Sequence, residues 1–134
     1  MRIRVATRGS ALALWQANRV SSLLTRTLPG VEVEIVTVET TGDRDQTTPL
    51  EQMGGLGVFV KEVQAAVLDG RADLAVHSAK DLPGGQTDGL ALAAVPERAD
   101  PRDVLVGCRL TSLPEGATVA TGSIRRRAHL ANHR

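Results

Sequence analysis

The first half of the chain alternates between two hydrophobic patterns, one typical of β-strands and the other of amphipathic helices. Residues 3–7, "IRVAT", alternate apolar and polar side chains, and residues 31–38, "VEVEIVTV", are rich in β-branched residues. Both segments therefore predict strands. A third strand is expected in "ADLAVHS", residues 72–78.

Segments with helical spacing connect these strands. Between the first two, apolar residues recur three or four positions apart, at Ala13, Ala17, Val20 and Leu24. Ser10 is placed to cap this helix, and Pro29 with Gly30 ends it. A second helix is predicted in "FVKEVQAAVLDG", residues 59–70, with Gly70 as its C-terminal cap.

The remaining segments are less periodic. Residues 40–57, "TTGDRDQTTPLEQMGGLG", are rich in glycine and polar residues, and we interpret them as a mobile loop beside the site. An apolar run follows at 90–95, and a strand is predicted at 104–107. Residues 117–123 are expected to end a later strand and to lead into a helix that begins near Ser123.

The order strand, helix, strand predicts an α/β fold with a mainly parallel sheet flanked by helices. In such sheets ligands bind beyond the carboxyl ends of the strands. The third strand runs directly into a polar stretch that contains His77, Ser78, Lys80 and Asp81. The sequence therefore predicts a binding site at this edge of the sheet.

A boundary is expected at "PERADPRD", residues 96–103, where charged residues stand between and beside two prolines. We predict a first domain over residues 1–96 and a hinge at 97–103. The beginning of a second domain would follow at 104–134.

Composition and charge exclude several classes of function. A formal net charge of +1 gives the chain no general field for binding polyanions. The arginine triplet 125–127 would suit a nucleic-acid binder, but Trp15 and Phe59 are the only aromatic residues and offer no stacking platform. Trp15 is expected in the core. Only two of the 16 basic residues are lysines, and arginine forks suit carboxylates or phosphates.

The chain shows no sign of secretion or membrane insertion. Its N-terminal apolar run is too short for a signal peptide, and no segment approaches the ~20 apolar residues of a membrane span. The single cysteine, Cys108, cannot form a disulfide within the chain, which fits a reducing compartment. We expect a cytoplasmic protein. His129 and His133 lack the acidic partner of a zinc site, so no metal is expected.

The motifs of this chain form a recognisable series. In order, they are "VATRGSALALWQA", "MGGLGVFVKE", "DLAVHSAKDLP", "ERADPRDVLV" and "ATGSIRRRAHL". In order and spacing, the series resembles the porphobilinogen deaminase family, also called hydroxymethylbilane synthase. The resemblance covers Arg4 to the last residue. It implies a transferase of porphyrin and haem biosynthesis that joins four porphobilinogen molecules head to tail and releases ammonia at each step.

The resemblance also implies a fold, a cofactor and partners. The expected fold is one lobe of a type II periplasmic-binding-protein architecture plus the start of a second lobe. Family members are longer monomers with three domains, and a cysteine of the third domain carries their dipyrromethane cofactor. Their partners are porphobilinogen and the growing polypyrrole, not nucleic acids or membranes. Cys108 stands in a different motif, so we expect the chain by itself to be inactive.

Matching the motifs residue by residue places the catalytic carboxylate at Asp81. Its implied role is to hydrogen-bond pyrrole N–H groups and to stabilise positive charge as ammonia leaves. The implied substrate and cofactor binders are Arg8, Ser10, Gln16, Ser78, Lys80, Thr121, Ser123, Arg125 and Arg126. Porphobilinogen carries an acetate and a propionate, which arginine forks and a helix N-terminus would bind.

The chain departs from the family pattern at several positions. Gln52 and Leu56 stand where many relatives carry lysines, which would weaken attraction to substrate carboxylates. Ala79 replaces a bulkier apolar residue, and Gly122 is often serine.

One alternative stays open. An anionic small-molecule-binding protein of the same architecture would keep Arg8 and Ser123 but would have no use for the carboxylate of Asp81, because like charges repel.

Overall fold

The computed structural model describes residues 1–44, 59–85 and 87–133. Its first half contains a small sheet built from the strands β1 (Arg2–Arg8), β2 (Glu32–Val38) and β3 (Leu74–Ala75). The strand order is β2-β1-β3, and β1 pairs in parallel with both neighbours. The prediction of an α/β fold with a parallel sheet is therefore confirmed.

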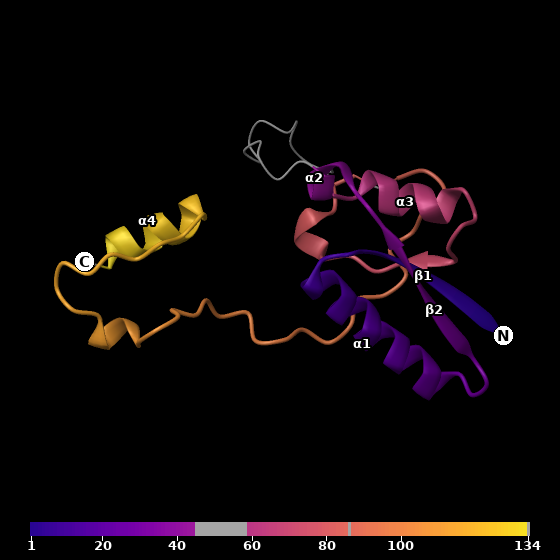
Figure 1. Ribbon diagram of the computed structural model, residues 1–134, viewed down its shortest axis with the longest axis horizontal. Coiled ribbons are helices and arrows are strands. Elements are labelled where there is room, and N and C mark those ends of the chain that lie inside the picture. The colour runs from indigo at the N-terminus through magenta and orange to yellow at the C-terminus, as the bar shows by residue number, and fades with distance from the viewer. Residues whose placement is uncertain (45–58, 86, 134) are drawn as a thin grey trace. The chain divides into compact units, whose positions relative to one another are not determined.

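Helices connect the strands and cover the sheet. They are α1 (Ala11–Thr27), α2 (Thr41–Arg44), α3 (Lys61–Leu68) and the 3₁₀ turn η1 (Ala79–Asp81). The first crossover runs from β1 to β2 through α1, and the second runs back from β2 past β1 to β3 through α3. Because they cross the sheet in opposite directions, right-handed connections place α1 and α3 on opposite faces. Figure 1 shows these two helices on either side of the strands. None of the described helices has both the length and the hydrophobicity needed to cross a membrane.

Alternation along β1 divides its side chains between the two faces. Thr7 is fully buried, and its hydroxyl lies 3.3 Å from the carbonyl oxygen of Ala13 in α1. Its neighbour Ala6 joins the opposite, α3-facing core, which also contains Val38, Val63, Ala66 and Ala72. Because side chains alternate with a period of two, Arg4 and Arg8 share the face of Ala6 at opposite ends of the strand.

Arg4 fastens the turn between α3 and β3 to the central strand. Its Nη2 and Nε donate to the two carboxylate oxygens of Asp73 at 2.8 and 3.2 Å, and its Nη1 donates to the Gly70 carbonyl at 2.8 Å. The backbone N–H of Arg4 adds a bond of 2.7 Å to the same carboxylate. These hydrogen bonds with Arg4 lower the pKa of Asp73 from 3.8 to about 2.

The predicted helix ends are confirmed. The Ser10 side chain accepts a hydrogen bond from the N–H of Ala13 at the start of α1. Gly70, just beyond α3, has a φ of 70°, a conformation that glycine adopts without strain. The prediction for Trp15 is wrong, because its side chain is 60% exposed. Two residues correspond to about 200° around a helix, so Trp15 faces away from the buried Ala17.

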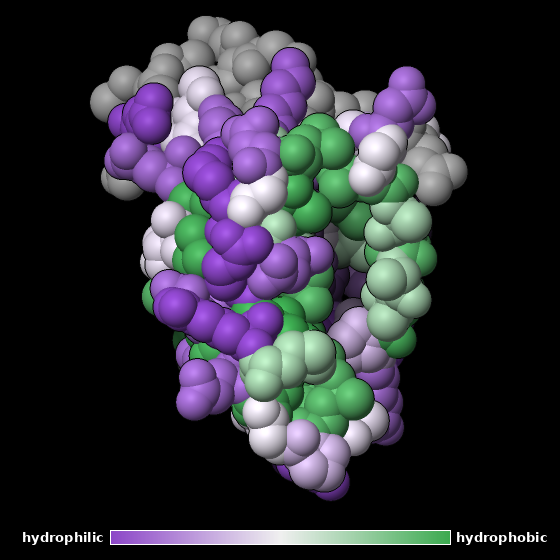
Figure 2. Space-filling model, turned by 90° about the vertical axis from the view of Figure 1, so that its right-hand side faces the viewer, coloured by the Kyte–Doolittle hydropathy of each residue, from purple (hydrophilic) through white to green (hydrophobic). Residues whose placement is uncertain are grey.

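Other predicted strands do not form within the described residues. The strand expected at 72–78 is reduced to β3, and residues 104–107 and 117–123 contain no strand. Val104 and Val106 are 89% and 95% exposed. A strand needs a hydrogen-bonding neighbour, and no described residue pairs with these segments. Figure 2 shows apolar (green) areas open to the surface on the face that it draws.

Contacts divide the chain into two compact units, Met1–Pro96 and Glu97–Arg134. The second contains the 3₁₀ turn η2 (Leu110–Ser112) and the helix α4 (Ile124–Asn132). Ser123 caps α4, as predicted. The assignment of two domains with a hinge at 97–103 stays a prediction.

The Arg4–Asp73 pair predicts a pH-dependent contribution to stability. At neutral pH we expect Asp73→Asn to lower the thermal unfolding midpoint, whereas Asp88→Asn, an exposed control, should not. The folded-state pKa is depressed, so the stabilisation is present above pH 3.8 and is lost as the pH falls toward 2. Thermal unfolding measured across this range should show the difference between parent and Asp73→Asn shrinking. A difference that does not change with pH would contradict the assignment.

Candidate functional site

A pocket of about 100 Å³ lies in the first unit, at the carboxyl ends of β1 and β3. This is the edge where the sequence predicts a ligand site. Its lining consists of Arg8, Ser10, Leu12, Ala13, Gln16, Val76, His77, Ser78, Lys80 and Asp81. Every binding or catalytic candidate that the sequence analysis chose in residues 1–96 therefore borders this pocket. Their individual roles stay predictions.

Asp81 and Lys80 enter the pocket from η1, the turn that follows the third strand. The backbone N–H of Asp81 donates to the Ser78 carbonyl oxygen at 3.1 Å, which closes the turn. Within the described residues, neither the Asp81 carboxylate nor the Lys80 ammonium has a hydrogen bond or an ion pair. An anion and a cation thus border the same pocket, both available to a ligand.

Ser10 and Gln16 come from the first turns of α1. The Ser10 hydroxyl accepts the Ala13 N–H at 3.3 Å, so it both caps the helix and borders the pocket. Further along α1, the Gln16 side-chain carbonyl oxygen accepts a hydrogen bond of 3.1 Å from the Ser78 hydroxyl. This bond ties α1 to the segment between β3 and η1 and fixes both polar side chains at the pocket wall.

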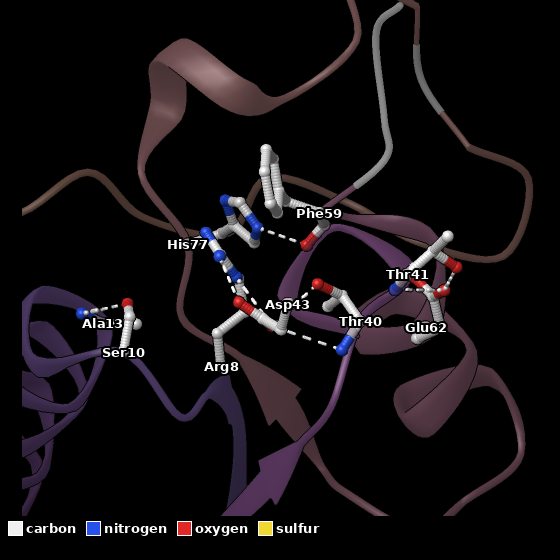
Figure 3. A network of polar contacts seen from close by, with 9 residues as sticks. All are labelled: Arg8, Ser10, Ala13, Thr40, Thr41, Asp43, Phe59, Glu62 and His77. Carbon is white, nitrogen blue, oxygen red and sulfur yellow. Dashed lines mark hydrogen bonds and ion pairs between the residues drawn. The ribbon is translucent and has the colours of Figure 1, made fainter. Parts of the chain in front are cut away.

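Arg8 is the most strongly held of the pocket residues (Figure 3). Its Nε donates to Asp43 at 3.2 Å, and its Nη2 donates to the other oxygen of the same carboxylate. The Phe59 ring covers the guanidinium, with 4.0 Å between the ring centroid and the guanidinium carbon. Hydrogen bonding to Arg8, helped by Thr40, lowers the pKa of Asp43 to about 2.

Three neighbours of the site were not predicted from the sequence: Asp43, Thr40 and Phe59. The first two lie in the stretch interpreted as a mobile loop, where Thr41–Arg44 forms a helical turn instead. The only signal in the sequence was that Asp43 is an acidic residue in a segment expected to lie beside the site that contains Arg8.

His77 fixes the backbone on the far side of this cluster. Its Nε2 lies 2.9 Å from the Phe59 carbonyl oxygen and donates to it, and its Nδ1 lies 3.2 Å from the Ser78 carbonyl oxygen. Thr41 supports α2 by donating its N–H and hydroxyl to Glu62 of α3 at 3.0 and 2.6 Å. Figure 3 shows His77, Phe59 and Asp43, which come from different segments, grouped around the Arg8 guanidinium.

The candidates of the second unit gather at the N-terminus of α4. Thr121 accepts the Ser123 N–H at 3.1 Å, and Ser123 accepts the Arg126 N–H at 3.3 Å. The Arg126 guanidinium pairs with Asp103 at 2.7 Å and lowers the pKa of that carboxyl. Arg125 is exposed and has no hydrogen bond or ion pair in the described residues.

The structure describes some of the remaining residues from the motif comparison. Gln52 and Leu56 lie outside the described residues. Ala79 is exposed in η1, and Cys108 is a free, exposed thiol. In the described part of the chain, no cluster of three or more His, Cys, Asp or Glu side chains could hold a metal ion.

Comparison with known proteins gives one consistent family. A family model described as "Porphobilinogen deaminase, dipyromethane cofactor binding domain" matches residues 3–134. The chain is 49% identical over 131 residues to a porphobilinogen deaminase of Geobacter sulfurreducens, covering 96% of this chain and 41% of the relative. A second relative with that name, from Maridesulfovibrio salexigens, is 48% identical over 132 residues, covering 96% and 43%. The chain thus spans about two fifths of the length of these relatives.

The close packing of Phe59 on α2 makes a sharp prediction. A Cβ added at Gly42 would overlap the Phe59 ring, whereas a Cβ at Gly84 would meet no atom within 4 Å. We expect Gly42→Ala to displace the ring from Arg8 and to reduce the free energy of unfolding by about 1–3 kcal/mol, the usual cost of overpacking. Gly84→Ala is the control. Urea unfolding and the Phe59 ring proton shifts measure both effects, and equal stabilities of the two variants would refute the packing described here.

Proposed function

The chain belongs to the porphobilinogen deaminase family, and we propose that it forms part of an enzyme that joins porphobilinogen units into hydroxymethylbilane with release of ammonia. The observation that supports this most is the pocket at the end of the sheet. Motif matching chose Arg8, Ser10, Gln16, Ser78, Lys80 and Asp81 from separate segments, and all of them line that one pocket.

The charges of the pocket suit such a ligand. Porphobilinogen carries an acetate and a propionate, for which Arg8 and Lys80 are cationic partners. The Ser10 hydroxyl lies at the N-terminus of α1, where backbone N–H groups and the helix dipole also favour an anion. In this proposal the cations and the helix terminus bind and orient the side-chain carboxylates.

Asp81 is the proposed catalytic residue. Loss of ammonia leaves positive charge on the pyrrole ring, and a fixed carboxylate near the ring nitrogen stabilises that charge. The η1 turn holds the backbone of Asp81, and its carboxylate has no hydrogen bond to the described residues. The group can therefore accept a pyrrole N–H without first breaking a bond within the protein.

A dipyrromethane cofactor carries carboxylates of the same kind, and hydroxyl, ammonium and guanidinium groups are suitable partners for them. For the first unit, we propose that Lys80 and Ser78 bind carboxylates of this kind. For the second unit, taken by itself, the family resemblance implies the same role for Thr121, Ser123, Arg125 and Arg126. When bound, the cofactor supplies the pyrrole end to which substrate units are added. A cytoplasmic location and a monomeric state, both implied by the resemblance, belong to the same proposal, as does a lobe like that of type II periplasmic-binding proteins.

Asp81 distinguishes an enzyme from an anion-binding protein. In a chimera, residues 1–134 would replace the matching residues of the Geobacter sulfurreducens relative. We expect the chimera to release ammonia from porphobilinogen, and Asp81→Asn to slow turnover on the order of a hundredfold with little change in substrate affinity. Asp88→Asn, an exposed control of the same chemistry, should keep the parent rate.

Two outcomes would contradict the proposal. An inactive chimera that is nevertheless folded would argue against the assigned activity. An active chimera in which Asp81→Asn turns over at the parent rate would leave Asp81 as a turn residue and would favour a role in ligand binding alone.

A further inference from the structure

The Arg8 guanidinium is held on one edge and on one face. Its Nε and Nη2 donate side by side to the two oxygens of Asp43, a bidentate geometry. The Phe59 ring covers the face, and only 18% of the Arg8 side chain remains exposed. An arginine on the surface would instead sample many rotamers.

The two partners of Arg8 are themselves fixed. Asp43 Oδ2 accepts the N–H of Thr40 at 3.2 Å and its hydroxyl at 2.7 Å, and Thr40 is fully buried. The Phe59 backbone carbonyl accepts the hydrogen bond from His77. Arg8 cannot turn away from Asp43 without giving up contacts to two chain segments, so its orientation is determined by the fold.

One guanidinium nitrogen of Arg8 remains for a ligand. Nη1 makes no hydrogen bond within the described residues, and Arg8 lines the pocket together with Ser10. The Ser10 hydroxyl accepts from the helix and keeps its own hydrogen for donation. Both residues line the same pocket.

We propose that Asp43 is a positioning residue for carboxylate recognition: it occupies the Nε–Nη2 edge of Arg8 and leaves Nη1 as the donor to the pocket. Asp43 also offsets much of the charge of Arg8. The pair therefore attracts carboxylates in general less strongly than a lone arginine would. It favours a ligand whose carboxylate meets Nη1 in one pose over other carboxylates. The choice of porphobilinogen as that ligand rests on the proposed function.

Asp43 can act on Arg8 through its negative charge or by fixing the orientation of the guanidinium, and one variant tests each effect. Asp43→Asn removes the charge and keeps the shape. Thr40→Val keeps the charge of Asp43 but removes one of the hydrogen bonds that hold it. Asp88→Asn and Thr37→Val make the same chemical changes at exposed positions outside the pocket. Thr40→Val carries the test by itself if Asp43→Asn does not fold.

The readouts are the NMR signal of the Arg8 Nε–H group and the affinities of the 134-residue chain for porphobilinogen, acetate and propionate. In the parent, each carboxylate should leave the Nε–H signal in its Asp43-bonded position. In Asp43→Asn this signal should move toward that of exposed arginines. The affinity for porphobilinogen relative to acetate should fall roughly tenfold, as expected for a lost charge-assisted contact. Thr40→Val should lower the ratio less, and the controls should not change it.

Several results would overturn the inference. If porphobilinogen or acetate shifts the Nε–H signal of the parent, the ligand displaces Asp43, and Asp43 is a competitor rather than a support. An unchanged affinity ratio in both pocket variants, or a parent chain that binds none of the three carboxylates, would also refute it. If the parent chain binds acetate and propionate but not porphobilinogen, the proposed function is contradicted. The inference about Asp43 is then tested by whether acetate and propionate leave the Arg8 Nε–H signal unchanged.

Discussion

The pairing of β1 with a neighbour on each side is the interaction on which the first unit depends. β1 hydrogen-bonds to β2 along its whole length and to β3 at Val5 and Ala6. It also packs against α1 and α3. Because the three strands are parallel, their carboxyl ends meet at one edge, and the polar residues after β1 and β3 become neighbours there. The pocket is a consequence of this topology.

The same strand uses arginine for two purposes. Arg4 and Arg8 lie on one face, each forms a bidentate pair with an aspartate, and both aspartates have a pKa lowered to about 2. Arg4, at the amino end, joins β3 to the central strand and has all three guanidinium nitrogens engaged. Arg8, at the carboxyl end, keeps one nitrogen for the pocket. A lysine offers a single point charge and could not fill two such roles at once.

Features that depend on neighbours in sequence were predicted well. Ser10, Pro29 and Gly70 set helix ends through local backbone chemistry, and the apolar spacing of α1 identified its buried face. The pocket candidates followed from motif matching together with the rule that ligands bind at the carboxyl ends of parallel strands.

Features that depend on distant partners could not be predicted in this way. Residues 104–107 have a strand-like composition, but a strand also needs a neighbour that composition does not reveal. Asp43 joins Arg8 across 35 positions, and Phe59 completes the cluster from a third segment. Nothing in the local pattern of either segment indicates such a contact.

The edge of the sheet between β1 and β3 is the proposed binding site for the ligand carboxylates. The most direct test is titration of the 134-residue chain with porphobilinogen while the backbone amide shifts are followed by NMR. We predict saturable changes that concentrate at Arg8, Ser10, Gln16 and residues 78–81. Changes that concentrate on other surfaces of the first unit, or that leave this edge unaffected, would contradict the claim.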